Sequence, residues 1–288
     1  MLYLKGYFQV LKYKNMSKVI LITGASSGMG KTTAIDLIKQ GHVVYGASRD
    51  VENMKELQEL GAYILNMDVT KDEEIRSGVE RIINEQGKID VLWNNAGYGL
   101  YGSVEETSID DARNQFEVNL FGLARLTQLV IPYMRKQKSG IIINTSSMGG
   151  KVYTPFGAWY HATKHALEGW SDCLRFELAP FGIKVVILEP GAIKTNWGNI
   201  MRRLLQERSS NGPYKEMVEA TIKAGDDAYK KDNASDPSVI SQTIQKIIVS
   251  DKPKTRYAVG KMAKPMIFIR KYFGDRVFDR VIKFYIRK

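Results

Sequence analysis

Short apolar runs alternate with longer amphipathic stretches between residues 18 and 196, and this alternation constrains the fold more than any other feature. The runs with strand character are VILIT (19–23), HVVYGAS (42–48), AYILNM (62–67), IDVLWNN (89–95), GIIINTSS (140–147) and GIKVVILEP (182–190). The stretches between them show helical periodicity. Strands that alternate with helices of this length form βαβ units with right-handed crossovers. The sequence therefore predicts an α/β fold, a doubly wound parallel sheet covered by helices on both faces.

The domain organisation follows from the same pattern. A chain of 288 residues suits one large α/β domain with a substantial core. We find no linker that divides residues 17–260, and after residue 196 the sequence becomes helical and charged, which predicts a C-terminal helical cap over the substrate. Residues 1–16 are interpreted as an N-terminal extension. Because Met16 is followed directly by the first strand, an alternative is that residues 1–15 are a misassigned start.

The net charge of +11 is concentrated at the two ends of the chain. Residues 1–18 carry four lysines and no acid, and residues 261–288 carry nine Lys and Arg against two Asp. Residues 19–260 are balanced, which argues against a nucleic-acid groove through the body. No stretch approaches the roughly 20 apolar residues of a spanning helix, and the first 16 residues make a poor secretion signal. We therefore expect a cytoplasmic protein. A single cysteine, Cys173, excludes a disulfide framework and is expected to be a small buried residue.

Residues 261–288 form a basic amphipathic tail. On a helix over residues 274–288, five apolar side chains share one face while Arg and Lys lie largely on the other; the five are Val277, Phe278, Val281, Ile282 and Tyr285. This pattern predicts a terminal helix that packs on the body. The alternative is a helix at a membrane surface, which would make the protein peripherally membrane-bound.

A glycine-rich turn, TGASSGMG, follows the first strand and leads into a helix. Gly24, Gly28 and Gly30 would allow a tight turn and close approach of the backbone to a pyrophosphate at the helix N-terminus. A competing interpretation is the phosphate loop of a nucleoside triphosphatase, because ASSGMGKT (25–32) departs from that motif only at Ala25. Lys31 and Thr32 would then hold phosphate and magnesium, and Asp90 in IDVL could serve as the second magnesium element.

Tyr160 and Lys164 are four residues apart in YHATK, which places both side chains on one face of a helix. A free tyrosine has a pKa near 10, and a neighbouring ammonium lowers the pKa of a phenol toward neutrality. Ser147 ends a strand thirteen residues earlier, where a parallel sheet has its ligand crevice. Asn119 lies in mid-helix, a poor position for asparagine that indicates a bound water or a local backbone interaction.

Seven motifs occur in the order and spacing of the classical short-chain dehydrogenase/reductase family: TGASSGMG, DVT, NNAG, FEVNLFG, INTSS, YHATK and PGAIKT. The resemblance covers about residues 17–196 and implies a Rossmann-type fold and hydride transfer between a nicotinamide cofactor and a ketone, aldehyde or alcohol. It argues against the phosphate loop, since a triphosphatase needs no YHATK after Ser147. The remaining alternative is a catalytically silent cofactor-binding protein of the same fold.

The resemblance also implies roles for individual residues. Tyr160 would be the general acid in reduction and the base in oxidation, and Lys164 would bind the nicotinamide ribose and lower the pKa of Tyr160. Ser147 would orient the carbonyl, and Asn119 would hold a water in a proton relay. The implied cofactor-binding residues are Gly24, Ser26, Ser27, Gly28, Met29, Gly30, Ser48, Arg49, Asp68, Val69, Asn95, Ala96, Gly97, Tyr160, Lys164, Pro190, Gly191, Ile193 and Thr195. No metal site is predicted.

The end of the second strand bears on the choice of nicotinamide cofactor. An acid there would select NAD, whereas VVYGASRD ends the strand on Ser48 followed by Arg49, which favours the 2′-phosphate of NADP. Asp50, about twenty residues after the glycines, keeps NAD open; we expect it instead to cap the next helix.

The substrate is less constrained by the sequence. Aromatic and apolar residues surround the expected crevice and together predict an apolar pocket for a lipophilic substrate: Tyr98, Tyr101, Met148, Tyr153, Phe156, Trp159 and Trp197. We expect several of them to pack in the core or in a lid instead of lining the pocket. YGASRD and EPGAIKTNW resemble the 17-beta-hydroxysteroid and retinol dehydrogenase-like branch of the family. The resemblance also leaves a homo-oligomer open, because dimers and tetramers are common in this family.

Overall fold

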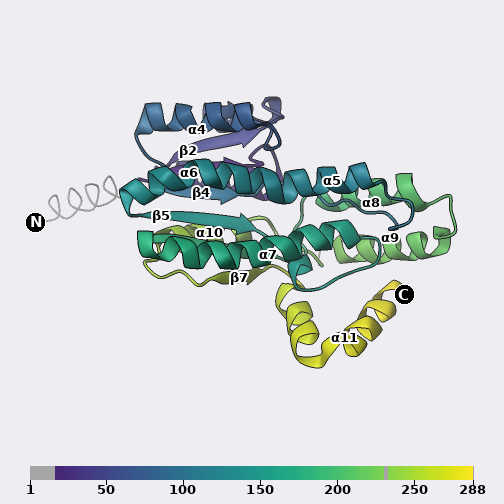
Figure 1. Cartoon of the computed structure of the whole chain (residues 1–288). Helices are drawn as coiled ribbons and strands as arrows, with labels where there is room; N and C mark the ends of the chain where they lie inside the picture. Colours follow the sequence, from purple (N-terminus) through teal and green to yellow (C-terminus); the bar gives the residue numbers. More distant parts are fainter. Residues whose placement is uncertain (1–16, 230–232, 288) are drawn as a thin grey trace, which may run out of the picture.

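A parallel sheet forms the centre of the computed structural model, with strands in the order β3-β2-β1-β4-β5-β6-β7 (Figure 1). The structure describes residues 17–229 and 233–287, so the predicted extension 1–16 lies outside the described residues. The strands are β1 (Val19–Thr23), β2 (Val43–Ser48), β3 (Tyr63–Asn66), β4 (Val91–Asn94), β5 (Gly140–Thr145), β6 (Ile183–Pro190) and β7 (Arg256–Val259). The strand order reverses between β1 and β4, which defines a topological switch point. The predicted doubly wound α/β fold is confirmed.

Helices cover both faces of the sheet and extend beyond its carboxyl edge (Figure 1). The α-helices are α2 (Gly28–Lys39), α3 (Lys55–Glu59), α4 (Asp72–Gln86), α5 (Ile109–Phe116), α6 (Leu123–Gln137), α7 (Ala158–Leu178), α8 (Trp197–Ser209), α9 (Lys215–Tyr229), α10 (Ser238–Val249) and α11 (Ala263–Arg287). Three 3₁₀ segments, η1 (Glu52–Met54), η3 (Met148–Gly150) and η4 (Ala179–Phe181), and a π-helical segment, η2 (Glu117–Gly122), complete the described elements. One core cluster joins the sheet to α2, α3 and α10, and a second joins it to α4, α6 and α7.

The first strand shows why the apolar runs have no alternation. Ile20 and Ile22 belong to the core on the α2 side, whereas Val19 and Leu21 belong to the core on the α4 side. Because successive side chains of a strand point to opposite faces, a strand buried on both faces must be apolar at every position. The register β1–β2 and β1–β4 is parallel throughout.

The C-terminal region contains one strand that the sequence did not predict. β7 pairs with β6 in parallel at the edge of the sheet, and its four residues are only half-buried. All four residues are intermediate in exposure, so the strand shows neither a buried apolar run nor an alternation of buried and exposed positions. Its hydrophobic pattern is therefore too weak to be recognised in the sequence.

The predicted cap is formed by α8 and α9, with α11 projecting beside them (Figure 1). α11 bends at Gly274, whose φ of 72° falls outside the helical range. In its second half Phe278 and Ile282 are buried against Val152 and Met266, as a helix packed on the body requires. Within the described residues, no helix has both the length and the apolar character needed to cross a membrane.

The expectation that Cys173 is buried is wrong, because its side chain is exposed on the outer side of α7. The helix buries Leu174 and Leu178 instead, which lie one turn apart. A residue one position before Leu174 points about 100° away from this buried stripe around the helix axis. The position of Cys173 on the helix therefore makes it exposed, although its side chain is small and only weakly polar.

Candidate active site

A cavity of about 740 Å³ lies at the carboxyl edge of the sheet, where β4, β5 and β6 end. Ten of the predicted site residues line it: Met29, Asn95, Gly97, Ser147, Tyr160, Lys164, Pro190, Gly191, Ile193 and Thr195. They come from segments as far apart in the sequence as residues 29 and 195, so the fold brings most of the predicted site together. The remaining predicted residues lie in the adjoining glycine loop, after the ends of β2, β3 and β4, and in η2.

The glycine loop has the backbone that the sequence predicted. Gly24 and Gly28 have φ values of 67° and 52°, which favour glycine. A Cβ at Gly30 would lie 2.2 Å from the carbonyl oxygen of Gly24, so no side chain fits there. The first turn of α2 contains no acidic residue, and the Ser27 side chain makes no capping bond. The N-terminus of α2 is therefore open to an anion.

Hydrogen bonds join the end of β1 to the NNAG segment (94–97) at the base of the crevice. Thr23 Oγ1 accepts hydrogen bonds from the backbone N–H groups of Asn95 and Ala96, both at 3.0 Å. The Asn95 side-chain amide donates to the carbonyl oxygens of Thr23 and Gly24. Its Oδ1 is buried and has no hydrogen-bond partner among the described residues. A buried acceptor beside an open cavity fits a ligand that donates a hydrogen bond, such as a ribose hydroxyl.

The end of β2 presents a polar cluster beside the glycine loop. Ser48 Oγ donates to Ser26 Oγ at 3.0 Å. The Arg49 side chain is 75% exposed, and its Nη1 lies 3.8 Å from Asp68 Oδ2. Asp50 instead accepts hydrogen bonds from the backbone and side-chain nitrogens of Asn53. The carboxylate of Asp50 thus accepts from the start of the next helix, as predicted. Ser48 Oγ also accepts from the backbone N–H of Asp50 at 3.1 Å, and the exposed Arg49 guanidinium lies beside the loop.

Tyr160 and Lys164 lie on the same face of α7, and both are buried. Lys164 Nζ lies 5.9 Å from the centre of the Tyr160 ring and donates to the carbonyl oxygen of Thr145 at 2.8 Å. Burial lowers the pKa of Lys164 to about 8. Burial also raises the pKa of Tyr160, and a hydrogen bond with Ser147 opposes this. The net direction for Tyr160 is opposite to the one predicted from the lysine, because the effect of removal from water is larger than that of the hydrogen bond with Ser147.

Asn119 lies in the π-helical segment η2 and is fully buried. Its Oδ1 accepts from the backbone N–H of Tyr98 at 3.1 Å, and its Nδ2 donates to the carbonyl oxygen of Tyr98 at 2.9 Å. These bonds fix the segment after NNAG. The Asn119 side chain thus binds the backbone of a residue 21 positions earlier in the sequence, and not the local backbone of its own helix. A π-helical segment of this kind often marks a functional site.

His161 is a residue that the sequence interpretation missed. Its Nδ1–H donates to the carbonyl oxygen of Gly149 at 2.9 Å, and its Nε2 accepts from the backbone N–H of Thr154 at 3.0 Å. The ring therefore ties the loop after Ser147 to the helix that carries Tyr160. Burial lowers the pKa of His161 to about 4, so the ring is neutral at pH 7. Its adjacency to Tyr160 in YHATK was the only signal available.

A cluster of ionic side chains around the buried Glu168 and Glu189 was also missed. Glu168 on α7 pairs with Lys151 at 2.8 Å and with Arg256 of β7 at 3.0 Å. Glu189, the residue before Pro190, lies 3.7 Å from the same guanidinium. Burial and the neighbouring Glu168 raise the pKa of Glu189. The cluster connects the edge strand β7 to α7 and to the end of β6.

The apolar residues expected around the crevice divide into two groups. Tyr98, Tyr101, Met148 and Trp197 line the cavity. Tyr153, Phe156 and Trp159 do not line it, which agrees with the expectation that several of these residues pack elsewhere. Tyr153 packs its ring on Phe278 of α11, and Phe156 is buried against Tyr214 of the cap. Both aromatic rings are occupied by the elements that follow residue 196, whose positions could not be read from the sequence.

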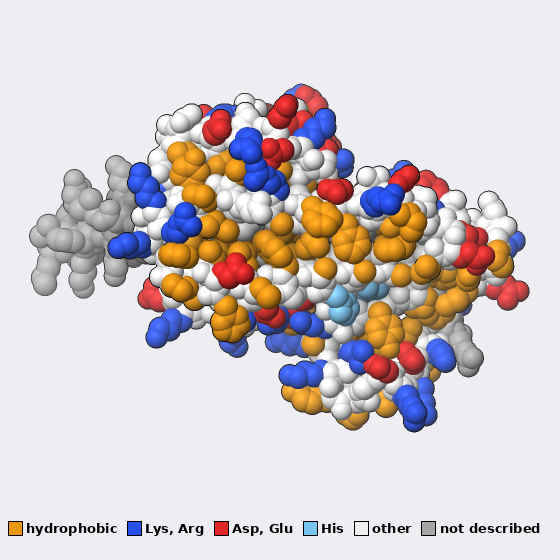
Figure 2. Space-filling model, viewed as in Figure 1, with side chains coloured by type: hydrophobic (Ala, Val, Ile, Leu, Met, Phe, Trp, Pro, Cys, Tyr) orange, Lys and Arg blue, Asp and Glu red, His pale blue; other side chains and the backbone are white. Residues whose placement is uncertain are grey.

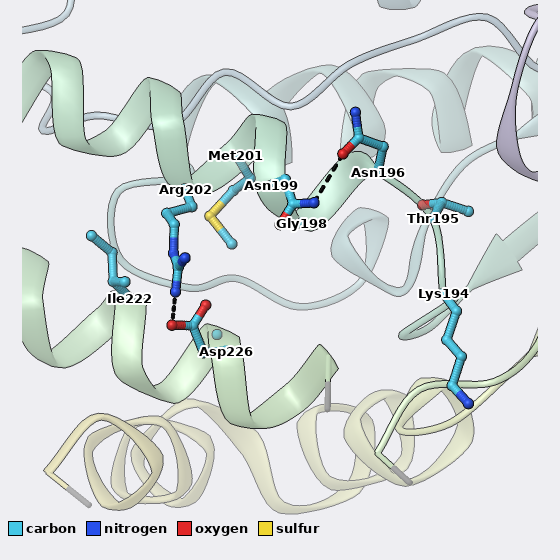
Figure 3. A pocket seen from close by; sticks show the side chains of 10 residues that line it. Lys194, Thr195, Asn196, Gly198, Asn199, Met201, Arg202, Ile222 and Asp226 are labelled. Atoms are coloured by element: carbon cyan, nitrogen blue, oxygen red, sulfur yellow. Dashed lines mark hydrogen bonds and ion pairs between the residues drawn. The ribbon is translucent and has the colours of Figure 1, made fainter. Parts of the chain in front are cut away.

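A second pocket of about 370 Å³ lies between the loop after β6 and helices α8 and α9 (Figure 3). It shares Thr195, Met201 and Gly225 with the main cavity. Figure 3 shows Lys194 at one side of this pocket and the ion pair between Arg202 and Asp226 at the other. The pocket thus adjoins the larger cavity and is lined in part by charged side chains.

The structure agrees with the rejection of a phosphate loop. Lys31 pairs with Glu56 at 2.9 Å, and Asp90 accepts from the backbone N–H of Val19 at 2.8 Å. Neither side chain is directed to a shared phosphate or metal position. Among the described residues, no cluster of His, Cys, Asp and Glu could hold a metal ion.

Comparison with known proteins gives the class of this chain. Residues 18–203 match the family model of short chain dehydrogenases, so the chain belongs to the short-chain dehydrogenase/reductase family. It is an oxidoreductase of the class that acts on CH–OH or C=O groups.

Individual relatives support the assignment. A 3-ketodihydrosphingosine reductase of Bacteroides thetaiotaomicron is 38% identical over 248 residues, which cover 86% of this chain and 89% of that protein. A short-chain dehydrogenase of Streptomyces avermitilis with 35% identity has a TM-score of 0.77, covering 88% of this chain and 92% of that one.

Two solved relatives hold different nicotinamide cofactors. A 3-ketoacyl-(acyl-carrier-protein) reductase from Brucella melitensis, complexed with NADH, is 26% identical with a TM-score of 0.71 and covers 83% of this chain and 94% of that one. A serine dehydrogenase complexed with NADP+ is 27% identical with a TM-score of 0.70 and covers 84% of this chain and 94% of that one. The family thus binds nicotinamide cofactors, and the open helix terminus, the glycine loop and the buried Asn95 acceptor of this chain fit such a group.

Proposed function

We propose that this protein is an NADP(H)-dependent oxidoreductase that interconverts a lipophilic ketone and its alcohol, with Tyr160 as the acid/base. The observation that carries the proposal is the arrangement of Tyr160, Ser147 and Lys164 on one side of a 740 Å³ cavity. Tyr160 and Ser147 both line this cavity, and Lys164 is held beside the Tyr160 ring by its hydrogen bond to the carbonyl oxygen of Thr145. The three side chains converge where a substrate oxygen would meet a nicotinamide ring.

A bound nicotinamide cofactor would supply or accept the hydride. In reduction, the hydroxyl of Ser147 donates a hydrogen bond to the substrate carbonyl oxygen and orients it. The hydroxyl of Tyr160 then gives its proton to the same oxygen as negative charge develops there. The Lys164 ammonium stabilises the phenolate left behind and binds ribose hydroxyls. In oxidation the phenolate of Tyr160 accepts the proton of the alcohol.

The preference for NADP rests on Ser48 and Arg49. Both lie at the end of β2 beside the glycine loop, and Asp50 is occupied by Asn53. A guanidinium forms strong charge-assisted bonds with a phosphate, whereas an acid at this place would repel it. We assign the 2′-phosphate to Arg49 and Ser48, and the adenine side to Asp68 and Val69.

The substrate class rests on the walls of the cavity. Val152, Met266 and Ile282 supply aliphatic surface opposite the polar residues at the sheet edge. Such a pocket favours an apolar molecule that carries one carbonyl or hydroxyl group. The relative named as a 3-ketodihydrosphingosine reductase fits this class, and the likeness to the steroid- and retinol-acting branch gives a second group of candidates.

The decisive experiment is substrate-dependent oxidation of NADPH by wild type and Tyr160→Phe. The panel contains long-chain 3-ketones, steroids, retinoids and small aryl ketones. We expect turnover of a lipophilic carbonyl that falls at least 100-fold in Tyr160→Phe, in line with the usual share of acid–base catalysis. Tyr63→Phe, a tyrosine on β3 away from the cavity, is the matched control. NADPH binding without turnover of any carbonyl would instead support the silent cofactor-binding alternative.

A further inference from the structure

Helix α11 carries a large share of the positive charge on a part of the molecule that stands out from the body (Figure 1). Residues 261–288 hold nine Lys and Arg against Asp275 and Asp279, whereas residues 19–260 hold equal numbers of basic and acidic side chains. In Figure 2 this projecting pair of half-helices shows Lys and Arg together with hydrophobic side chains. Residues 261–288, most of which form α11, therefore contribute a net charge of +7, and residues 1–18 contribute the remaining +4.

An exposed aromatic cluster lies on the same element. Phe268, Tyr272 and Phe273 are 54%, 62% and 57% exposed. Their ring centres lie 4.8 Å apart for Phe268 and Tyr272, and 6.0 Å apart for Phe268 and Phe273. Phe284 in the second half of the helix is exposed to a similar degree. Single exposed aromatic residues are common on protein surfaces. A cluster of them indicates a surface that binds a membrane or another molecule.

Cations and aromatics are interleaved on the first half of α11. Lys264, Phe268 and Lys271 are spaced i, i+4 and i+7, which places them on one helix face. Lys271 Nζ lies 5.0 Å from the centre of the Tyr272 ring. This arrangement suits the boundary between anionic headgroups and acyl chains, where aromatic rings insert and lysines remain at the surface. A second copy of the chain fits less well, because two strongly cationic helices would repel each other.

The inner side of α11 forms part of the wall of the active-site cavity. Met266, Ile282, Tyr285 and Ile286 line the cavity. Ile282 is buried, whereas Tyr285 is 47% exposed. A side chain that both lines a cavity and contacts solvent lies at its mouth. The element with the cationic aromatic surface therefore also borders the opening through which a ligand would pass.

We propose that α11 binds the surface of an anionic lipid bilayer through Lys264, Lys271 and the aromatic cluster, and that it holds the cavity mouth at Tyr285 against the lipid. An apolar substrate then passes from the bilayer into the cavity without crossing water. The proposal that α11 binds the bilayer depends only on the surface of α11. The proposal that the substrate enters from the bilayer also depends on the proposed function.

The test uses the full-length protein and vesicles of phosphatidylcholine, alone or mixed with an equal amount of phosphatidylglycerol. We expect sedimentation with the anionic vesicles only, and release at high salt, since ionic strength screens the attraction. The double substitution Lys264→Glu/Lys271→Glu should lower the affinity at least 30-fold, from about one kcal/mol for each basic residue at the surface. Phe268→Ser/Tyr272→Ser/Phe273→Ser should lower it about tenfold or more.

Matched controls are Lys136→Glu and Phe181→Ser, which change an exposed lysine and an exposed phenylalanine at the amino edge of the sheet. They should bind vesicles like wild type. All variants should keep the wild-type thermal midpoint and turnover of a water-soluble ketone, because none of the changed side chains lines the cavity.

Two results would overturn the proposal. One is equal binding of wild type and the charge-reversed variant to anionic vesicles, or no binding by either. The other is a change of oligomeric state in the aromatic variant with vesicle binding unaltered, which would show that a second copy covers this face. Vesicle binding without any turnover would overturn only the proposed function, whereas turnover without vesicle binding would overturn only the assignment of α11.

Discussion

Lys164 Nζ donates a hydrogen bond to the carbonyl oxygen of Thr145 at 2.8 Å, and this bond joins α7 to the carboxyl end of β5. The bond holds a buried ammonium beside Tyr160 and leaves its other N–H groups for the cavity. Because the ammonium is removed from water, its charge is sensitive to pH in a range where an exposed lysine would remain protonated.

The first prediction concerns the pH dependence of cofactor binding. Burial lowers the pKa of Lys164 to about 8, so the side chain is cationic at pH 7 and loses its charge as the pH rises through 8. If Lys164 binds the ribose through its ammonium, the dissociation constant for NADPH should increase between pH 7 and 9. Lys164→Arg keeps its charge to above pH 12 and should bind more weakly at pH 7 without this dependence. Fluorescence titrations would measure both, and a flat wild-type profile would contradict the assigned role.

The second prediction concerns cofactor selection. Arg49→Ala removes the exposed guanidinium at the end of β2, and we expect the KM for NADPH to rise by about tenfold or more, as for loss of a charge-assisted phosphate contact. The KM for NADH should change little. Asp50→Asn is the matched control, because Asp50 bonds Asn53 and not the loop. Equal effects of Arg49→Ala on both cofactors would rule out the NADP assignment.

The third prediction concerns acid stability. The pKa of His161 is about 4 in the folded protein and near 6.5 when unfolded. Above pH 6.5 the ring is neutral in both states and its contribution is fully present. As the pH falls from 6.5 toward 4, the unfolded state binds a proton first, so stability is lost by on the order of 3 kcal/mol. Urea unfolding at pH 7 and pH 4.5 should show this loss in wild type and a smaller one in His161→Gln. If wild type and His161→Gln lost the same unfolding free energy between pH 7 and pH 4.5, His161 would not be the cause of the loss.

The fourth prediction concerns the glycine loop. In Gly30→Ala the new Cβ would meet the carbonyl oxygen of Gly24 at 2.2 Å, so the loop must move. We expect loss of NADPH affinity and a destabilisation of about 1 to 3 kcal/mol, as for overpacking. Gly169→Ala in α7 is the control, because its Cβ would meet nothing within 4 Å. That change should be neutral or stabilise by up to about 1 kcal/mol. Thermal melts and NADPH titration would separate the two variants.

Much of the site could be predicted from the sequence, because its elements are local. The strand VILIT, the turn glycines and the spacing of Tyr160 and Lys164 depend on periodicity and backbone freedom over fewer than ten residues. In a parallel sheet, the carboxyl ends of the strands must lie at one edge. Local patterns therefore placed Ser147, Asn95 and Tyr160 around one cavity before any tertiary contact was known.

Other features depend on pairs of residues that no local pattern connects. Arg256 reaches Glu168 across 88 positions of sequence, and only the pairing of β7 with β6 brings them together. The buried position of His161, the exposure of Cys173 and the contact of Tyr153 with α11 likewise depend on which surface each helix turns toward its neighbours.

The sequence by itself determined the family, the parallel sheet and the residues proposed for catalysis, because these follow from short-range backbone geometry and ordered motifs. Only the tertiary structure decided that α11 borders the cavity with Ile282 while its outer side exposes Phe268 and Tyr272. An amphipathic pattern shows that a helix has an apolar face, but the energy gained by burying that face depends on the shape of the partner surface. That shape exists only once the chain has folded.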